Sequence, residues 1–138
     1  MKSRATLLRL KRFQVDEKRR RVTQIETMIA EFERMAVDLT REITSEEERA
    51  GISDPSHFAY PTYAKAAMQR RDNLRHSADE LRTQLDDAQA DLQEAFEDLK
   101  KVEILEDREQ ARERTAETAR DQAEMDHIGL SRVAQARA

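Results

Sequence analysis

Apolar residues recur at every seventh position along the first fifty residues of the chain. The members of this series are Leu8, Val15, Val22, Ile29, Ala36, Ile43 and Ala50. A second series lies between its later members, at Ile25, Phe32 and Leu39. The corresponding earlier positions hold Lys11 and Lys18, so the first turns have a weaker apolar face. Two apolar positions per heptad predict a helix that packs along one narrow face, here over residues 3–50.

A second heptad pattern begins after residue 61. Its apolar members are Ala64, Ala67, Leu74, Ala78, Leu81, Leu85, Ala88, Leu92, Ala95, Leu99 and Val102. Arg71 is the one polar residue in the series, and beyond Val102 the same positions hold Glu106, Glu109 and Glu113. The pattern predicts a helix whose core-facing stripe ends near residue 105.

The chain contains two glycines and two prolines, and their positions divide it. They are Gly51, Pro55, Pro61 and Gly129. Three of them fall in the connection 51–61, and Gly129 is the predicted stop of a second helix over 62–128. Two long helices joined by a short connection predict an all-α fold, an antiparallel coiled-coil hairpin forming a single domain over residues 1–138.

The two apolar series match each other when paired residue numbers sum to about 110. This register sets Ile29 against Leu81 and Val22 against Ala88. The chain from about residue 110 onward then has no partner, so we expect an overhang that is either a lone polar helix or a frayed tail.

Charge changes the picture at the start of the chain. The net charge is −4, but residues 1–21 carry nine basic and two acidic side chains, a balance of +7. The register places this segment beside carboxylates that would neutralise part of it: Asp91, Glu94, Glu97, Asp98 and Glu103. The segment is either a solvated face of this kind or a surface that docks onto an acidic protein. Nucleic-acid binding is disfavoured, because Phe13 is the one aromatic residue within the segment and the whole chain is acidic.

Candidate chemistry is sparse. The three histidines, His57, His76 and His127, lie far apart in the sequence, and there is no cysteine. We therefore predict no catalytic, metal or cofactor site, and no enzyme activity. The connection and the start of the second helix hold Phe58, Tyr60 and Tyr63, which form either a self-packed tip or an exposed contact patch.

The amino terminus, MKSRATLLRLKR, has an apolar run of two leucines only. It lacks the apolar region of a secretion signal, and no stretch of the chain is apolar enough for a membrane span. The sequence therefore predicts a cytoplasmic protein.

The opening LLRLKRFQVDEKRRR, the unbroken heptads, the turn HFAYPTYAKA and the second long Ala/Leu/Glu/Arg helix together resemble the FliJ-type flagellar export proteins. The resemblance implies a non-enzymatic component of the flagellar type III export apparatus, with a hairpin similar to the coiled-coil stalk subunit of rotary ATPases. It implies that the paired chain ends bind the hexameric export ATPase and that another part of the hairpin contacts the export-gate membrane protein. Escort of export chaperones is also attributed to the family.

The resemblance assigns partner-binding residues only by their position along the hairpin. The ATPase-facing end would hold Arg9, Lys11, Arg12 and Phe13. The gate-contacting end would hold Phe58, Tyr60, Tyr63 and Met68. The alternative from another functional class is a generic cytoplasmic coiled-coil scaffold or oligomerisation module without an ATPase partner.

Overall fold

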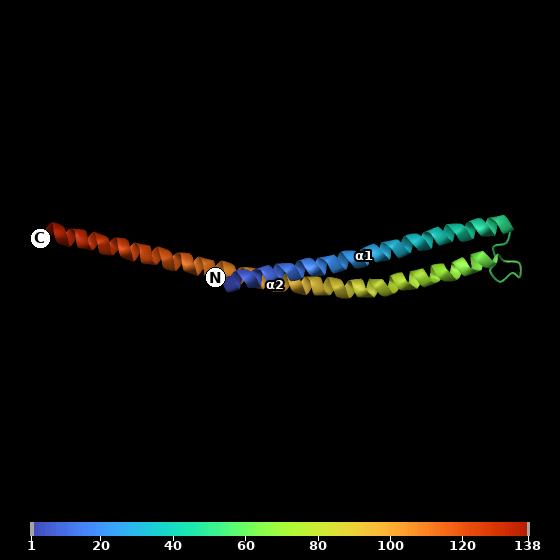
Figure 1. Cartoon of the computed structure of the whole chain (residues 1–138), viewed down its shortest axis with the longest axis horizontal. Coiled ribbons are helices and arrows are strands. Elements are labelled where there is room, and N and C mark those ends of the chain that lie inside the picture. Colours follow the sequence, from blue (N-terminus) through green and yellow to red (C-terminus); the bar gives the residue numbers. More distant parts are fainter. Residues whose placement is uncertain (1, 138) are drawn as a thin grey trace. The chain divides into compact units, whose positions relative to one another are not determined.

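The computed structural model describes residues 2–137 and contains two α-helices, which are labelled in Figure 1. Helix α1 spans Lys2–Ala50 and helix α2 spans Thr62–Arg137. The two helices pack against each other, and no strand occurs within residues 2–137. The predicted all-α helical hairpin is confirmed.

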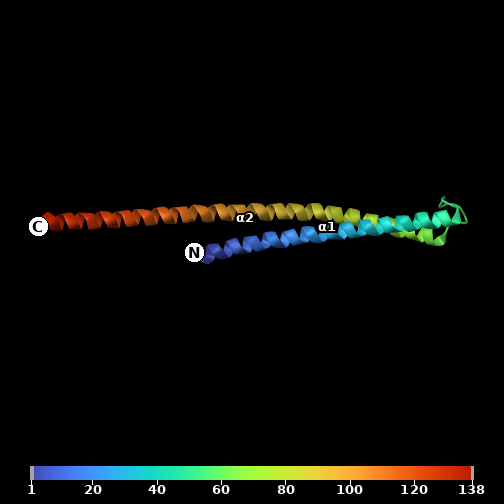
Figure 2. The same cartoon turned by 90° about the horizontal axis from the view of Figure 1, so that it is seen from above.

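The chain divides into two compact units. The loop unit consists of residues 13–95, and the terminal unit consists of residues 2–12 together with 96–137. Within the loop unit, α1 and α2 run side by side from residue 13 to the connection, as both views show (Figures 1 and 2). Each unit therefore contains its own contacts between the two helices.

The turn out of α1 is built by backbone hydrogen bonds around Gly51. The Gly51 N–H is shared between the Glu47 carbonyl oxygen at 2.9 Å and the Glu48 carbonyl oxygen at 3.3 Å, and the Ile52 N–H lies 3.3 Å from the Glu47 carbonyl oxygen. The bonds from Gly51 to Glu48 and from Ile52 to Glu47 form the Schellman arrangement, which requires a left-handed residue after the helix. Gly51 supplies it with a φ of 71°. At the start of α2, the Pro61 carbonyl oxygen accepts the Lys65 N–H at 3.1 Å, so the second helix begins directly after the proline.

The core of the loop unit consists of two apolar clusters. The first contains Val22, Ile25, Ile29, Leu81 and Ala88, with Phe32, Leu85 and Leu92 packed against them. The second contains Leu39, Ile43, Tyr60, Ala64 and Ala67, with Ile52, Met68 and Leu74 packed against them. The pairs expected from the heptads, Val22 with Ala88 and Ile29 with Leu81, fall within one cluster.

The sequence predicts that the second helix ends at residue 128, and this prediction is wrong. It continues through Gly129 to Arg137. Glycine lowers helix stability by about 1 kcal/mol relative to alanine but retains its N–H group, so it ends a helix only where the chain turns left-handed. Gly129 does not adopt a positive φ. The overhang is thus the lone helix of the two alternatives, and the side chains over 110–137 are exposed.

Candidate partner-binding surfaces

The residues predicted for the ATPase-facing end are largely exposed. In the terminal unit, Arg9 and Arg12 are exposed and Lys11 is half-buried. None of these three side chains makes an ion pair or hydrogen bond within residues 2–137. In the loop unit, Phe13 leaves 56% of its surface exposed. Free guanidinium groups on a helix surface suit an acidic partner, because no internal carboxylate competes for them.

Arg4, by contrast, is held by internal contacts. In the terminal unit its Nε lies 3.5 Å from Glu106 Oε2, its Nη1 lies 3.6 Å from Glu109 Oε2, and its Nη2 donates a hydrogen bond to Glu113. The hydrogen bond to Glu113, followed by the charges of all three carboxylates, raises the pKa of Arg4 above its usual value. The three glutamates occupy the positions where the apolar stripe of α2 has ended.

The Arg4 contact was not expected from the sequence, although a signal existed. Arg4 precedes Lys11 by seven residues and so belongs to the second heptad series of α1. The predicted register, with numbers that sum to about 110, pairs Arg4 with Glu106. Elsewhere in the basic segment, Arg19 lies 3.9 Å from Asp16 and Arg20 pairs with Glu17, both within α1. Part of the basic charge is therefore neutralised by contacts that differ from the expected ones.

The connection between the helices is a structured loop. The Asp54 carboxylate accepts hydrogen bonds from the Ser56 N–H at 3.0 Å and from the Ser56 hydroxyl at 2.7 Å. These two bonds lower the pKa of Asp54 below its usual value. His57 Nδ1 accepts the Ala59 N–H at 3.0 Å, and the His57 carbonyl oxygen accepts the Tyr60 N–H at 3.1 Å. The backbone on both sides of Phe58 is thus held in place.

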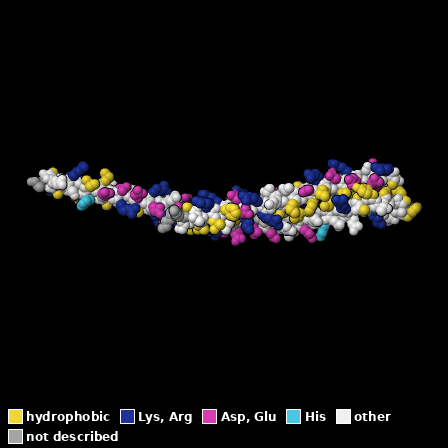
Figure 3. Space-filling model, viewed as in Figure 1, with side chains coloured by type: hydrophobic (Ala, Val, Ile, Leu, Met, Phe, Trp, Pro, Cys, Tyr) yellow, Lys and Arg dark blue, Asp and Glu magenta, His cyan; other side chains and the backbone are white. Residues whose placement is uncertain are grey.

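Phe58 projects from this loop with 96% of its surface exposed. Its ring stacks on His57, with ring centroids 4.7 Å apart and an angle of 24° between the planes. Apolar side chains gather toward this loop on the face that Figure 3 shows. An exposed aromatic ring on a preorganised loop loses little conformational freedom on binding, which is the property of an interface anchor.

The other residues predicted for the gate-contacting end divide between interior and surface. Tyr60 is 7% exposed, and its hydroxyl donates to Glu47 Oε2 at 3.0 Å and lies 3.5 Å from the half-buried Met68 Sδ. Tyr63 is 55% exposed and donates to Glu42 Oε2 at 2.6 Å. Tyr60 and Met68 therefore form the self-packed part of the tip, and Phe58 and Tyr63 are available to a partner.

The described part of the chain contains neither a metal-binding cluster nor a membrane-spanning helix. Residues 2–137 contain no group of three His, Cys, Asp or Glu side chains placed to hold a metal ion. Neither helix has, within those residues, a stretch sufficiently long and apolar to cross a bilayer.

The comparison with protein families decides the assignment. The family model described as flagellar FliJ protein matches residues 1–138, the whole chain. The chain belongs to the FliJ family. FliJ-family proteins are components of flagellar export, and this chain is therefore a flagellar export component. No curated protein and no solved structure matches this FliJ-family chain.

Proposed function

We propose that this FliJ-family protein is a non-enzymatic coupling stalk of the flagellar export apparatus. Its basic end binds the hexameric export ATPase, and its loop binds the cytoplasmic domain of the export-gate membrane protein. Escort of export chaperones belongs to the same role. The observation that carries this proposal is the separation of two exposed aromatic residues, Phe13 and Phe58, by an uninterrupted pair of helices within the loop unit.

The helix pair between these residues has the properties that coupling requires. From Phe13 to Ala50, α1 rises about 55 Å at about 1.5 Å per residue. This stretch contains no glycine or proline, and two apolar clusters pack it against α2. Packed helices of this kind resist bending, because bending would open the buried layers. A displacement at one end is therefore transmitted toward the other.

The ATPase contact is tested by mixing the protein with a flagellar export ATPase and measuring hydrolysis and hexamer formation. We expect both to rise with the wild-type protein. The double variant Arg9→Glu/Arg12→Glu should lose most of the effect, because it replaces two free cations by anions. The matched control is Arg34→Glu/Arg41→Glu, which makes the same change in net charge elsewhere on α1 and should retain the effect. A wild-type protein that changes neither quantity would instead favour a scaffold without an ATPase partner.

The gate contact is tested with the isolated cytoplasmic domain of the export gate. Phe58→Ala should weaken binding by about 10-fold or more, the effect of removing an aromatic anchor. Phe13→Ala is the matched control, because it removes an exposed phenylalanine from the other end of the same helix pair. For binding to the ATPase we expect the opposite, namely that Phe13→Ala weakens binding and Phe58→Ala does not. If both variants weaken both interactions equally, the assignment of one partner to each end is wrong.

A further inference from the structure

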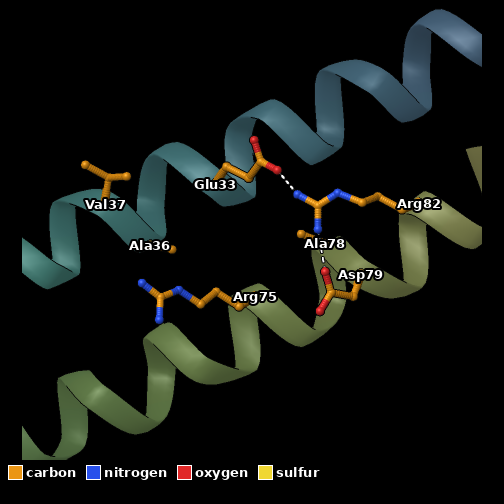
Figure 4. Close-up of a pocket in the computed structure, with 7 residues that line it drawn as sticks. All are labelled: Glu33, Ala36, Val37, Arg75, Ala78, Asp79 and Arg82. Atoms are coloured by element: carbon orange, nitrogen blue, oxygen red, sulfur yellow. Dashed lines mark hydrogen bonds and ion pairs between the residues drawn. The ribbon is translucent and has the colours of Figure 1, made fainter.

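A shallow groove runs along one face of the loop unit, between α1 and α2. It consists of two neighbouring hollows of about 460 and 510 Å³, which share Glu33 and Arg82. Arg82 bridges the groove, because it pairs with Glu33 across the helices and with Asp79 on its own helix (Figure 4). Between its charged residues the groove is lined by small and apolar side chains: Ile29, Ala30, Ala36, Val37, Ala78 and Leu85. The small residues leave room for another helix to approach closely.

Four charged residues of alternating sign follow the α2 edge of this groove. They are Arg75, Asp79, Arg82 and Asp86. Their spacings of four, three and four residues place them on one stripe of the helix. The outer two, Arg75 and Asp86, are exposed and make no ion pair or hydrogen bond within residues 2–137. In Figure 4 the Arg75 side chain extends alone toward Ala36.

This charge order is complementary to itself when it is reversed. In an antiparallel pair of such stripes, Arg75 meets Asp86 of the second copy and Asp79 meets Arg82 of the second copy. Each of these contacts occurs twice about a two-fold axis, so all four charges face an opposite charge. A parallel pair would set each charge against its own kind. We propose that a second copy of this chain docks on the groove and forms an antiparallel, two-fold symmetric dimer.

The α1 edge of the groove is compatible with the same arrangement. The level of α2 between Asp79 and Arg82 corresponds to Ile29 and Ala30 in α1, because opposed residue numbers sum to about 110. Antiparallel pairing there sets Ile29 against Ala30 of the second copy, and Glu26 against Glu33 of the second copy. The Glu33 charge is offset by its ion pair with Arg82 of the same chain. The α1 edge adds apolar contact, because Val37 is 49% exposed.

The proposed dimer is independent of the stalk proposal. None of the four charged residues belongs to the sets assigned to the ATPase or to the gate. Most of its contacts are between exposed charges, which salt screens. The dimer is therefore weak and dissociates as the ionic strength rises.

Sedimentation equilibrium of the full chain tests this proposal over a range of concentrations and salt. We expect a monomer–dimer equilibrium whose dissociation constant rises about 10-fold or more between low and high salt. Asp86→Arg should abolish the dimer, because it creates two repulsive contacts with Arg75. Arg75→Asp should do the same. The double variant Arg75→Asp/Asp86→Arg should restore the dimer, because the exchanged charges are again complementary.

Three further measurements distinguish this interface from association through another surface of the chain. Asp87→Arg is the matched control, with the same change of charge on another face of α2, and it should dimerise like the wild type. Mixing the two single variants should yield a heterodimer. Circular dichroism should show equal helicity for all variants. A wild-type protein that stays monomeric at low salt, or a dimer that Asp86→Arg leaves intact, would overturn the proposal.

The antiparallel direction can be measured separately, because the chain has no cysteine to remove. Spin labels on single cysteines at positions 83 and 69 should give different distances between copies. With the two-fold axis between Glu80 and Leu81, the labelled positions of the two copies are separated along the helix direction by about 7 Å for position 83 and about 35 Å for position 69. Equal distances at the two positions would mean a parallel dimer and would contradict the proposed interface.

Discussion

At the scale of the residue, position on the helix decides how a polar side chain behaves. Arg4 and Lys11 occupy equivalent heptad positions of α1. Arg4 contacts three carboxylates, whereas Lys11 makes no ion pair in the described part of the chain. The difference arises on α2, where the apolar stripe has given way to Glu106 and its neighbours opposite Arg4. Arg4 therefore replaces an apolar layer by an ionic one.

Removal of the Arg4 guanidinium should loosen the start of α1. Arg4→Gln leaves Glu106, Glu109 and Glu113 without their shared cation, so their mutual repulsion is no longer offset. We expect faster amide hydrogen exchange over residues 2–12, with exchange in the loop unit unchanged. Arg9→Gln is the control, because Arg9 has no partner to lose. Similar exchange rates in both variants would show that the Arg4 contacts do not hold this segment.

Tyr60 should make the stability depend on pH in the alkaline range. Burial, followed by the hydrogen bond to Glu47, raises the pKa of Tyr60 above its usual value near 10.0. The folded protein holds this proton more tightly than the unfolded chain does. The stabilising contribution is complete below that usual value and is lost as the pH rises through the raised pKa.

The measurement is urea unfolding of the wild type and of Tyr60→Phe between pH 8 and pH 12, roughly two units on either side of the usual tyrosine pKa. The wild type should lose stability relative to the variant as the pH rises. A Tyr63→Phe background removes the second tyrosine whose pKa is raised, in that case by its hydrogen bond to Glu42. A constant difference between wild type and variant would contradict the role of Tyr60.

At the scale of the element, the two glycines have opposite roles although both lie near expected helix ends. Gly51 ends α1 in a left-handed conformation with a φ of 71°, whereas Gly129 continues α2. Apart from the adjoining backbone and neighbouring residues, no atom lies within 4 Å of the place that a Cβ would occupy at either glycine. The local backbone, and not steric crowding, therefore distinguishes the two sites.

Alanine substitutions should reveal this difference. Gly51→Ala should destabilise the protein by about 1 kcal/mol, because an L-residue is strained in the left-handed region. Gly129→Ala should increase helicity near the C-terminal end, because alanine is favoured over glycine in a helix by up to about 1 kcal/mol. Thermal unfolding checks the first substitution and circular dichroism checks the second. If both substitutions changed stability and helicity in the same way, the helix ends would differ from those described.

The stability of the helix pair depends on a narrow core, so single apolar residues matter. Ile25 is 1% exposed and is the largest fully buried side chain in the described part of the chain. Ile25→Ala should cost about 2–5 kcal/mol in the free energy of unfolding, through lost burial and the cavity left behind. Met28→Ala, at a position that is 41% exposed, should cost less than about 0.5 kcal/mol. Denaturant unfolding of the two variants measures both losses of stability. Similar losses for Ile25→Ala and Met28→Ala would contradict the described core.

At the scale of the whole molecule, the two apolar clusters lie in the loop unit and the three-carboxylate contact of Arg4 lies in the terminal unit. Helix α2 continues beyond Glu113 with exposed side chains. These residues contribute helix but no buried layer. The stability of the protein is therefore expected to reside in the paired parts of the two helices.

Truncation after Glu113 tests this distribution of stability. The shortened protein retains both clusters and all three partners of Arg4, so its melting temperature should match that of the full chain. Its total helical signal should fall in proportion to the residues removed. A large drop in the melting temperature would show that the removed segment packs against another part of the chain.

The sequence by itself determined the two helices apart from the C-terminal end of α2, their pairing and the bounds of the connection. Heptad period, Gly51 and Pro61 are local signals, and the partner layers of Ile29 and Val22 follow from them by counting. The same counting would have paired Arg4 with Glu106, since an ionic layer obeys the register that apolar layers define.

Only the tertiary structure decided which side chains of the tip are inside. Tyr60 and Phe58 are two residues apart and similar in kind, yet one is buried against α1 and the other is almost fully exposed. The groove between α1 and α2 was likewise invisible in the sequence. Burial depends on how closely a distant segment approaches, and that distance is set by packing across the helix pair and not by the order of neighbouring residues.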